Sequence, residues 1–98
     1  MEIVWTEKAD ETFDEIADWI EERFTQKEVD TFVLTTYEVL DNIEEFPKSY
    51  PMSKTLKRVR KAVIHPHSSL YYRIRKREIE LLFFWDNRRN PEDKAQVV

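Results

Sequence analysis

The sequence predicts a single α+β domain in the order β-α-α-β-β-β, in which a helical hairpin packs on a mainly antiparallel four-stranded sheet. Apolar residues recur at helical spacing in the first half of the chain and alternate with period two in the second half. A helical pair set apart from a run of strands is typical of α+β folds. A length of 98 residues suits one hydrophobic core, so we expect residues 1–98 to form one domain.

The first helix is expected directly after a short strand. Residues 3–5 (Ile-Val-Trp) favour a strand, Thr6 is a good N-cap, and Glu7 lies in the first turn, where the helix dipole favours an anion. Acidic residues occupy most of the helix outside one apolar stripe, which consists of Ala9, Phe13, Ile16, Ala17, Ile20 and Phe24. Trp19 lies at the edge of this stripe, and we interpret it as a packing residue.

A second helix is predicted to begin almost at once, because Thr25 and Glu28 have the spacing of a capping box. Its apolar residues form two neighbouring stripes: Val29, Val33, Leu40 and Ile43 in one, and Phe32, Val39 and Phe46 in the other. A face this wide can contact both the first helix and a sheet. Pro47 ends the helix, and residues 48–54 have the composition of a surface loop.

Three strands are predicted in the remainder of the chain. Residues 57–65 form the first, which Pro66 closes, and residues 70–91 contain a β-hairpin. In the first hairpin strand Leu70, Tyr72 and Ile74 share one face and Tyr71, Arg73 and Arg75 the other. In the second, Ile79, Leu81, Phe83 and Trp85 are expected on one face and Glu80, Leu82, Phe84 and Asp86 on the other. Apolar residues on both faces indicate a central strand.

The composition excludes several classes of site. The chain has no cysteine and no glycine, which rules out disulfides, thiolate zinc sites, cysteine nucleophiles and glycine-rich phosphate loops. No apolar run approaches the roughly 20 residues needed to cross a bilayer, and the first residues do not resemble a signal peptide. We therefore expect a soluble cytoplasmic protein with no membrane association.

The net charge of −4 hides an asymmetry between the two halves. Residues 1–46 carry fifteen acids against three bases (net −12), whereas residues 47–98 carry thirteen bases against five acids (net +8). The helices are thus expected to present an acidic surface and the sheet with its loops a basic one. Since the field depends on where charges lie, the acidic average does not exclude a polyanionic partner.

The basic residues of the predicted strands are the main candidates for function. They are Arg58, Arg60, Lys61, Arg73, Arg75, Arg88 and Arg89. Guanidinium groups gathered on one sheet face suit phosphate or carboxylate, because each donates two parallel hydrogen bonds, and Tyr71 and Tyr72 could stack on bases. The alternative is a solvated strand face, which we favour for the turn around Lys76.

His65 and His67 could act as a general base or as metal ligands. No cysteine exists and no acidic residue lies within several positions, so a metal site is disfavoured. Ser68 and Ser69 follow the histidines, but no nucleophile elbow can form without glycine. We expect neither a metal nor a cofactor.

Taken together, the order of elements and several short motifs resemble the RelE/ParE family of type II toxin–antitoxin toxins, also called plasmid stabilisation proteins. The motifs are the step from Trp5-Thr6 into the first helix, the helix end at residues 45–47, Arg60 at the start of the second strand, residues 70–74 (Leu-Tyr-Tyr-Arg-Ile) and residues 86–91 (Asp-Asn-Arg-Arg-Asn-Pro). The resemblance covers nearly the whole chain.

This resemblance implies a growth-inhibiting toxin that a cognate antitoxin protein neutralises. The family has two branches, of which one cleaves messenger RNA on the ribosome without a metal and the other poisons DNA gyrase. If the chain is a ribonuclease, the catalytic candidates are Arg60, Arg73 and Arg89 for charge stabilisation, with Tyr71 and His65 for proton transfer, or His67 in place of His65. Candidates for contacts with nucleic acid or antitoxin are Arg58, Lys61, His67, Arg75 and Arg88.

Two positions depart from the ribonuclease pattern. Ser69 stands where ribonuclease members often carry an arginine, and no aromatic residue follows Pro91. The acidic average is also unusual for a protein that docks on ribosomal RNA. Whether the chain is an enzyme therefore stays open, and a family member that only binds its antitoxin without toxicity is the alternative.

Overall fold

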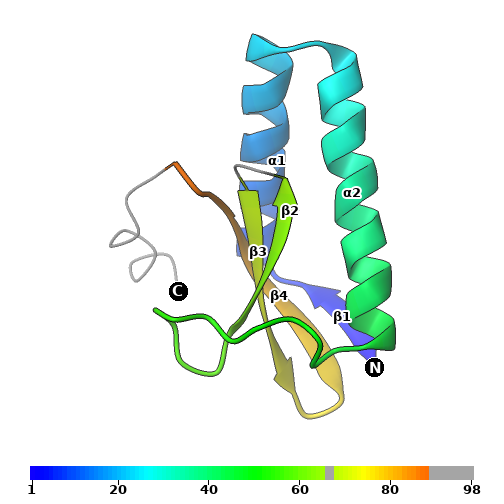
Figure 1. The fold of residues 1–98 in the computed structure, drawn as a ribbon, viewed down its shortest axis with the longest axis vertical. Helices are drawn as coiled ribbons and strands as arrows, with labels where there is room; N and C mark the ends of the chain where they lie inside the picture. Colours follow the sequence, from blue (N-terminus) through cyan, green and yellow to red (C-terminus); the bar gives the residue numbers. More distant parts are fainter. Residues whose placement is uncertain (66–67, 89–98) are drawn as a thin grey trace.

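The computed structural model of this protein describes residues 1–65 and 68–88. It contains six elements in the predicted order: β1 (Glu2–Trp5), α1 (Glu7–Arg23), α2 (Gln26–Glu45), β2 (Arg60–His65), β3 (Ser68–Arg75) and β4 (Glu78–Asp86). The four strands form one sheet in the order β1-β4-β3-β2 (Figure 1). β1 runs parallel to β4 and the other neighbours are antiparallel, which confirms the α+β prediction and the central place of β4.

Local signals set the helix boundaries as predicted. Thr6 caps α1 by accepting a hydrogen bond from the Ala9 backbone N–H at 3.1 Å. At the start of α2, the Glu28 carboxylate accepts from the Thr25 backbone N–H at 3.0 Å and from the Thr25 hydroxyl, and this contact lowers the pKa of Glu28. Phe24, the C-cap of α1, is followed directly by Thr25, the N-cap of α2, so the chain turns back and the helices form a hairpin.

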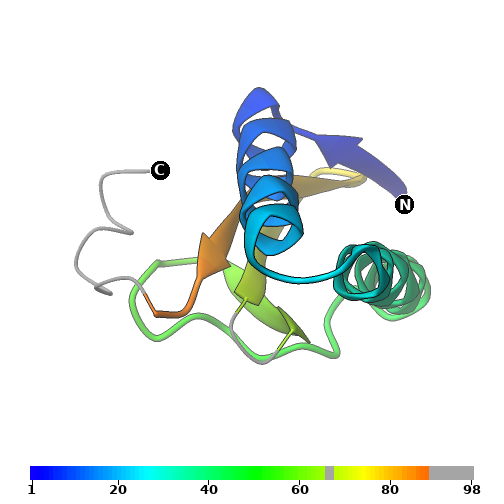
Figure 2. The same ribbon diagram turned by 90° about the horizontal axis from the view of Figure 1, so that it is seen from above.

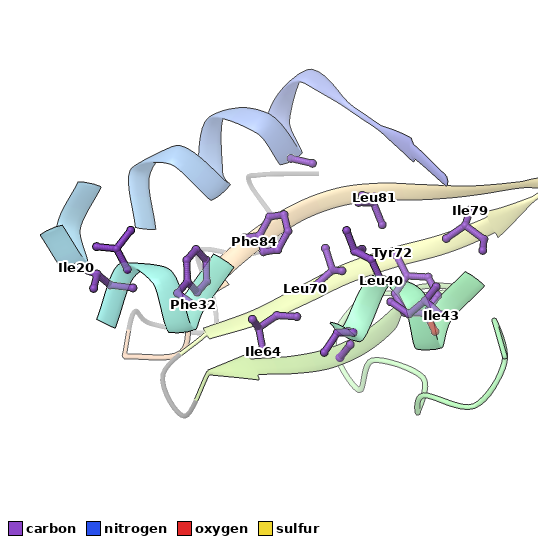
Figure 3. Close-up of a cluster of buried hydrophobic side chains, with 14 residues drawn as sticks. Ile20, Phe32, Leu40, Ile43, Ile64, Leu70, Tyr72, Ile79, Leu81 and Phe84 are labelled. Carbon is purple, nitrogen blue, oxygen red and sulfur yellow. The ribbon is translucent and has the colours of Figure 1, made fainter. Parts of the chain in front are cut away.

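Both helices pack on the same face of the sheet (Figure 2). The main core lies between the helices and the sheet. It includes Phe32 and Ile43 from α2 and Leu70 and Tyr72 from β3, all with no exposed surface (Figure 3). Phe13 of α1 joins this core through ring contacts with several other aromatic residues. No helix in residues 1–65 and 68–88 is long and apolar enough to span a membrane.

The opposite face of the sheet carries a second, smaller apolar cluster. It consists of Val59, Tyr71, Phe83 and Trp85, with Leu56 and Leu82 packed against it. Tyr71 is fully buried and stacks on Phe83 with ring centroids 4.9 Å apart. The basic face predicted for β3 is therefore only partly basic, because the loop before β2 covers its centre with apolar side chains.

The predicted faces of β4 were wrong in their second half. The register shifts between Tyr71 and Tyr72 of β3, whose partners are Phe83 and Leu81, so Leu82 is an extra residue that forms a β-bulge. Before the bulge Ile79 and Leu81 face the helices; after it Phe84 does. Phe83 and Trp85 are turned to the second cluster instead. A bulge reverses the alternation, and period-two reasoning cannot see it.

Helix α1 stabilises this bulge where β1 ends. The Thr6 hydroxyl donates to the carbonyls of Leu81 and Leu82, at 2.7 and 3.1 Å. The buried Thr12 hydroxyl accepts from the Phe84 backbone N–H at 2.8 Å. β1 pairs with β4 only as far as Trp5. Beyond that point the two threonines form hydrogen bonds with backbone groups of β4 that would otherwise be buried without partners.

Strand β2 begins at Arg60, three residues later than predicted. Arg58 has a φ of 61°, in the left-handed region, which no strand residue adopts. Lys76 in the β3–β4 turn has a φ of 58°. A chain without glycine must place other residues at such positions, which costs roughly 1 kcal/mol each.

Candidate functional site

Arg60 lies at the first position of β2, opposite Tyr72, and faces the same side of the sheet as the helices. Its Nη1 atom donates to the backbone carbonyls of Tyr50 at 2.7 Å and Lys48 at 3.2 Å. These bonds fasten the segment that follows α2 to the sheet. The guanidinium is half-buried and already occupied, so its visible role is structural.

The two adjacent tyrosines of β3 have different surroundings. The Tyr72 hydroxyl donates to the Pro47 carbonyl at 2.8 Å, and burial raises the pKa of Tyr72 to about 12 although the charge of Arg60 opposes the shift. Tyr71 lies on the other face and has no exposed surface. Neither position favours base stacking, and a phenol as deeply buried as that of Tyr71 is poorly placed to take a proton from RNA.

Arg73 forms an ion pair across the hairpin. Its Nε atom donates to the Glu80 carboxylate at 2.6 Å, with the side chains 38% and 24% exposed. Arg75 lies opposite Glu78 at the end of the hairpin and is exposed. A partly exposed pair of this kind contributes at most about 1 kcal/mol, but it neutralises the guanidinium locally.

Arg88 lies past the end of β4 and is the best-anchored cation of the group. It donates to the Asp86 carboxylate from Nε at 2.9 Å and from Nη2 at 2.5 Å. The guanidinium also lies over the ring of Trp19, 3.7 Å from the centroid, and Arg23 approaches the same ring at 4.7 Å. Cation–π contacts of this kind stabilise by about 0.5–1 kcal/mol at exposed sites.

The cationic candidates do not converge within the described residues. Arg60 and Arg73 lie on opposite faces of the sheet, because Tyr72 and Arg73 are successive in β3. Asp86, which holds Arg88, is six residues beyond Glu80 in β4, or roughly 20 Å along the strand. The predicted single arginine cluster is therefore not formed by these three residues.

The remaining candidates are divided between the surface and the residues that are not described. Arg58 is exposed, and Lys61 is half-buried beside Tyr71. His65 is the last residue of β2, but its side chain lies outside the described part of the chain, as do His67 and Arg89 entirely. Their predicted roles in catalysis or binding stay predictions.

Ser69 accounts for one departure from the ribonuclease pattern. It is fully buried, and its hydroxyl lies 3.1 Å from Oδ1 and 2.9 Å from Nδ2 of Asn87. An arginine at this position would bury a guanidinium where the structure holds a neutral hydrogen-bonded pair, which is costly.

A first hollow lies between the tip of the helical hairpin and the end of β4, with a volume of about 350 Å³. Its wall is mainly apolar, with Trp19, Ile20, Phe24 and Phe84, while Glu15, Glu28, Asp86 and Arg88 bring charge of both signs. Phe24, the C-cap of α1, is 55% exposed.

A second hollow lies beside the edge strand β2 and has a volume of about 710 Å³. The loop of residues 50–55 forms one wall, and Lys61, Val63 and Tyr71 form the other. Among the described residues two lysines and no acid line it, so the charge that they bring is of one sign, unlike that of the first hollow.

Sequence reasoning missed both hollows. The position of Trp19 at the border of the α1 stripe was a signal for the first, because a large aromatic there can face a gap. Val63 was a signal for the second, since alternation along the strand places it on the opposite face from Ala62 and Ile64. In the structure its side chain is 57% exposed. The bulge and the loop before β2, which shape these sites, carry no local sequence signature.

Comparisons with known proteins place these features in context. A family model described as the ParE toxin of the type II toxin–antitoxin system parDE matches residues 3–91. A solved structure described as the chromosomal ParDE TA system from P. aeruginosa has a similar fold, with a TM-score of 0.76 and 19% identity over 88% of this chain and 95% of that chain. A comparison with curated proteins gives no match.

Proposed function

The chain belongs to the ParE family of toxins from type II toxin–antitoxin systems, and on this premise we propose that it arrests growth by poisoning DNA gyrase and that a cognate antitoxin protein neutralises it. The family resemblance alone leaves two targets, messenger RNA on the ribosome and gyrase. The surroundings of the cationic residues favour gyrase.

The observation that carries this choice is the engagement of the arginines. Arg60 is bound to backbone carbonyls, Arg73 to Glu80 and Arg88 to Asp86. Charge stabilisation at a cleaved phosphate needs preorganised donors aimed at one point. The two described catalytic candidates, Arg60 and Arg73, are paired and lie on opposite faces of the sheet, so they do not provide this. The third, Arg89, lies outside the described residues. A target bound through a protein surface does not require donors aimed at one point.

Two further features agree with a non-nucleolytic toxin. Tyr71 is buried, which leaves the histidines among the predicted proton acceptors of a ribonuclease. Ser69 is buried against Asn87 at the position where an arginine is frequent in the ribonuclease branch. The helical hairpin, whose outer surface is acidic, is then the candidate contact surface for gyrase, on the basis of the family resemblance.

Expression in growing cells tests the proposal. We expect growth arrest, accumulation of cleaved DNA and a DNA-damage response, with intact transcripts. Co-expression of the small gene beside this one should restore growth. RNA ends clustered at codons during arrest, lost in Arg89→Ala, would instead assign the ribonuclease branch. If cells grow normally while folded protein is verifiably expressed, the chain is instead a non-toxic family member that only binds its antitoxin.

Antitoxin binding is the second part of the proposal. The charge asymmetry supports it, since residues 47–98 carry net +8 and an antitoxin segment with acidic and apolar residues could cover a surface of this kind. Purification of the two proteins together checks it directly: a complex that survives size-exclusion chromatography is expected.

A further inference from the structure

Strand β2 is an edge strand, and the described part of the chain closes its outer edge only at the start. There the Ser53 N–H donates to the Val59 carbonyl at 2.6 Å, and the Lys61 N–H donates to the Pro51 carbonyl at 3.0 Å. Met52 accordingly forms a short antiparallel bridge with Arg60. The loop before β2 thus acts as a fragment of a fifth strand that stops after about one pair.

The next outward-facing residue of β2 has no such partner. Peptide groups of a strand point alternately to its two neighbours, so if Val59 and Lys61 point outward, Val63 does too, while Ala62 points to β3. No residue in the described ranges forms a hydrogen bond with the outward N–H or carbonyl of Val63. Its side chain is 57% exposed. An open edge with an exposed β-branched residue is a template for strand pairing.

The hollow of about 710 Å³ beside this edge defines what can pair there. Met52, 48% exposed, and Val63 offer apolar contacts at the two ends of the open stretch. Lys54 and Lys61 provide the charge, and none of the lining residues within 1–65 and 68–88 is acidic. An extended segment with alternating apolar and acidic side chains matches both features.

We propose that the open edge of β2 binds an extended segment of the antitoxin by strand addition, next to the Met52–Arg60 bridge. Apolar side chains of the segment pack on Met52 and Val63, and its carboxylates face Lys54 and Lys61. The identity of the partner rests on the proposed function. A second copy of this chain fits less well, because pairing of two β2 edges would bring like charges together.

The acidic helices strengthen the choice of site. An acidic segment is repelled by residues 1–46, which carry net −12, and is attracted to the side of the molecule where the loop before β2 lies. Electrostatics therefore directs the segment to this edge before any backbone hydrogen bond forms.

Amide hydrogen exchange of the full-length protein, alone and in complex with the product of the neighbouring small gene, tests the proposal. The Val63 amide should exchange rapidly in the free protein and at least tenfold more slowly in the complex. The Ala62 amide, bonded to β3 in both states, is the internal control. A stable complex in which Val63 exchange is unchanged would overturn strand addition. If the two proteins form no complex at all, the proposed antitoxin binding itself is contradicted, and with it the identity of the segment proposed to bind at β2.

Val63→Pro provides the matching variant. It deletes only an outward N–H that the fold does not use, and edge strands tolerate proline at such positions. We expect the dissociation constant to rise about tenfold or more, since main-chain hydrogen bonds supply much of the affinity in strand addition. Val63→Thr keeps the N–H and should bind within about threefold of the original protein. Equal binding of folded Val63→Pro would count against the proposal.

Lys54→Glu keeps the test decisive if Val63→Pro does not fold, because Lys54 is exposed and its replacement is expected to leave the core unchanged. It should weaken binding and reduce the dependence of affinity on salt. Unchanged affinity and salt dependence would contradict the proposed orientation of the segment. If exchange of the Val63 amide in the protein alone becomes slower as the protein concentration rises, the edge pairs with a second copy of the chain. That result would overturn the proposal that the antitoxin binds there.

Discussion

Arg60 and Tyr72 hold the chain after α2 against the sheet by donating three hydrogen bonds to backbone carbonyls of residues 47–50. This segment has no regular secondary structure to satisfy those carbonyls. The side chains of Arg60 and Tyr72 therefore supply the hydrogen bonds that strand pairing would otherwise provide. They hold in place the start of the loop that covers the second apolar cluster. A cation that the sequence suggests for phosphate binding serves the fold instead.

Replacing Arg60 by methionine should destabilise the protein by roughly 1.5–3 kcal/mol, because two hydrogen bonds from a charged donor are lost, one of them at the half-buried carbonyl of Tyr50. Urea unfolding measures the effect. Arg75→Met is the matched control: Arg75 is exposed at the hairpin end, so its replacement should change stability by no more than about 0.5 kcal/mol. Equal stabilities of the two variants would contradict the anchoring role of Arg60.

The pKa of Tyr72 predicts a loss of stability in alkali. Burial raises this pKa to about 12 in the folded protein from an ordinary value of 10. Between pH 10 and 12 the unfolded chain releases the proton while the folded protein retains it, so the unfolded state binds fewer protons and stability falls as pH rises. Tyr72→Phe should show a shallower fall than the original protein in urea titrations across this range. Parallel pH profiles would exclude Tyr72 as the source.

At the scale of elements, the contact between α1 and β4 decides the shape of the sheet. β1 pairs with β4 only as far as Leu81, and α1 continues along the same edge with Thr6 and Thr12. The bulge at Leu82 lies where the pairing with β1 ends and the contacts with Thr6 and Thr12 begin. It turns Phe83 and Trp85 to the side of the sheet away from the helices. One extra residue thus creates the second apolar cluster.

Thr12→Val should cost about 1–3 kcal/mol, because it leaves the buried Phe84 N–H without its acceptor while preserving side-chain volume. Thr31→Val is the matched control, since Thr31 bonds only to a carbonyl of its own helix and is exposed. Thermal unfolding of both variants compares them. A loss for Thr12→Val no larger than that for Thr31→Val would show that the bulge does not depend on this bond.

At the scale of the whole molecule, charge and exposed edges are distributed unequally. The acidic helices cover one face of the sheet, and the other carries the second apolar cluster with Arg73 and Lys61. The open part of the β2 edge and the hollow beside it lie next to Lys54 and Lys61. The acidic surface and the basic surface therefore lie on different sides of the molecule.

Growth inhibition by Arg73→Gln separates the two possible targets. If the protein poisons gyrase through the helical surface, this variant should arrest growth as the original protein does, because Arg73 lies on the opposite face and its pair with Glu80 adds little stability. In a ribonuclease, loss of one preorganised donor reduces the rate on the order of a hundredfold or more. Growth curves with matched protein levels measure this, and relief of arrest would count against the gyrase assignment.

The sequence by itself determined the order of the elements, the helix caps at Thr6 and Thr25, the central place of β4 and the family resemblance. These follow from local signals, namely periodicity, cap chemistry and charge, that neighbouring residues carry together. The same signals identified the arginines as chemically notable residues but not what each one binds.

Only the tertiary structure decided which side chains are available. The faces of β4 depend on a bulge whose partner atoms in Thr12 lie 72 residues away in the chain, and period-two patterns extend only a few residues. Arg60, Arg73 and Arg88 find carbonyls, a carboxylate and an aromatic ring that folding brings to them. Tyr71, predicted on a basic surface, is buried because a loop without regular pattern covers it. Contacts between distant segments set these outcomes, and no short stretch of sequence encodes them.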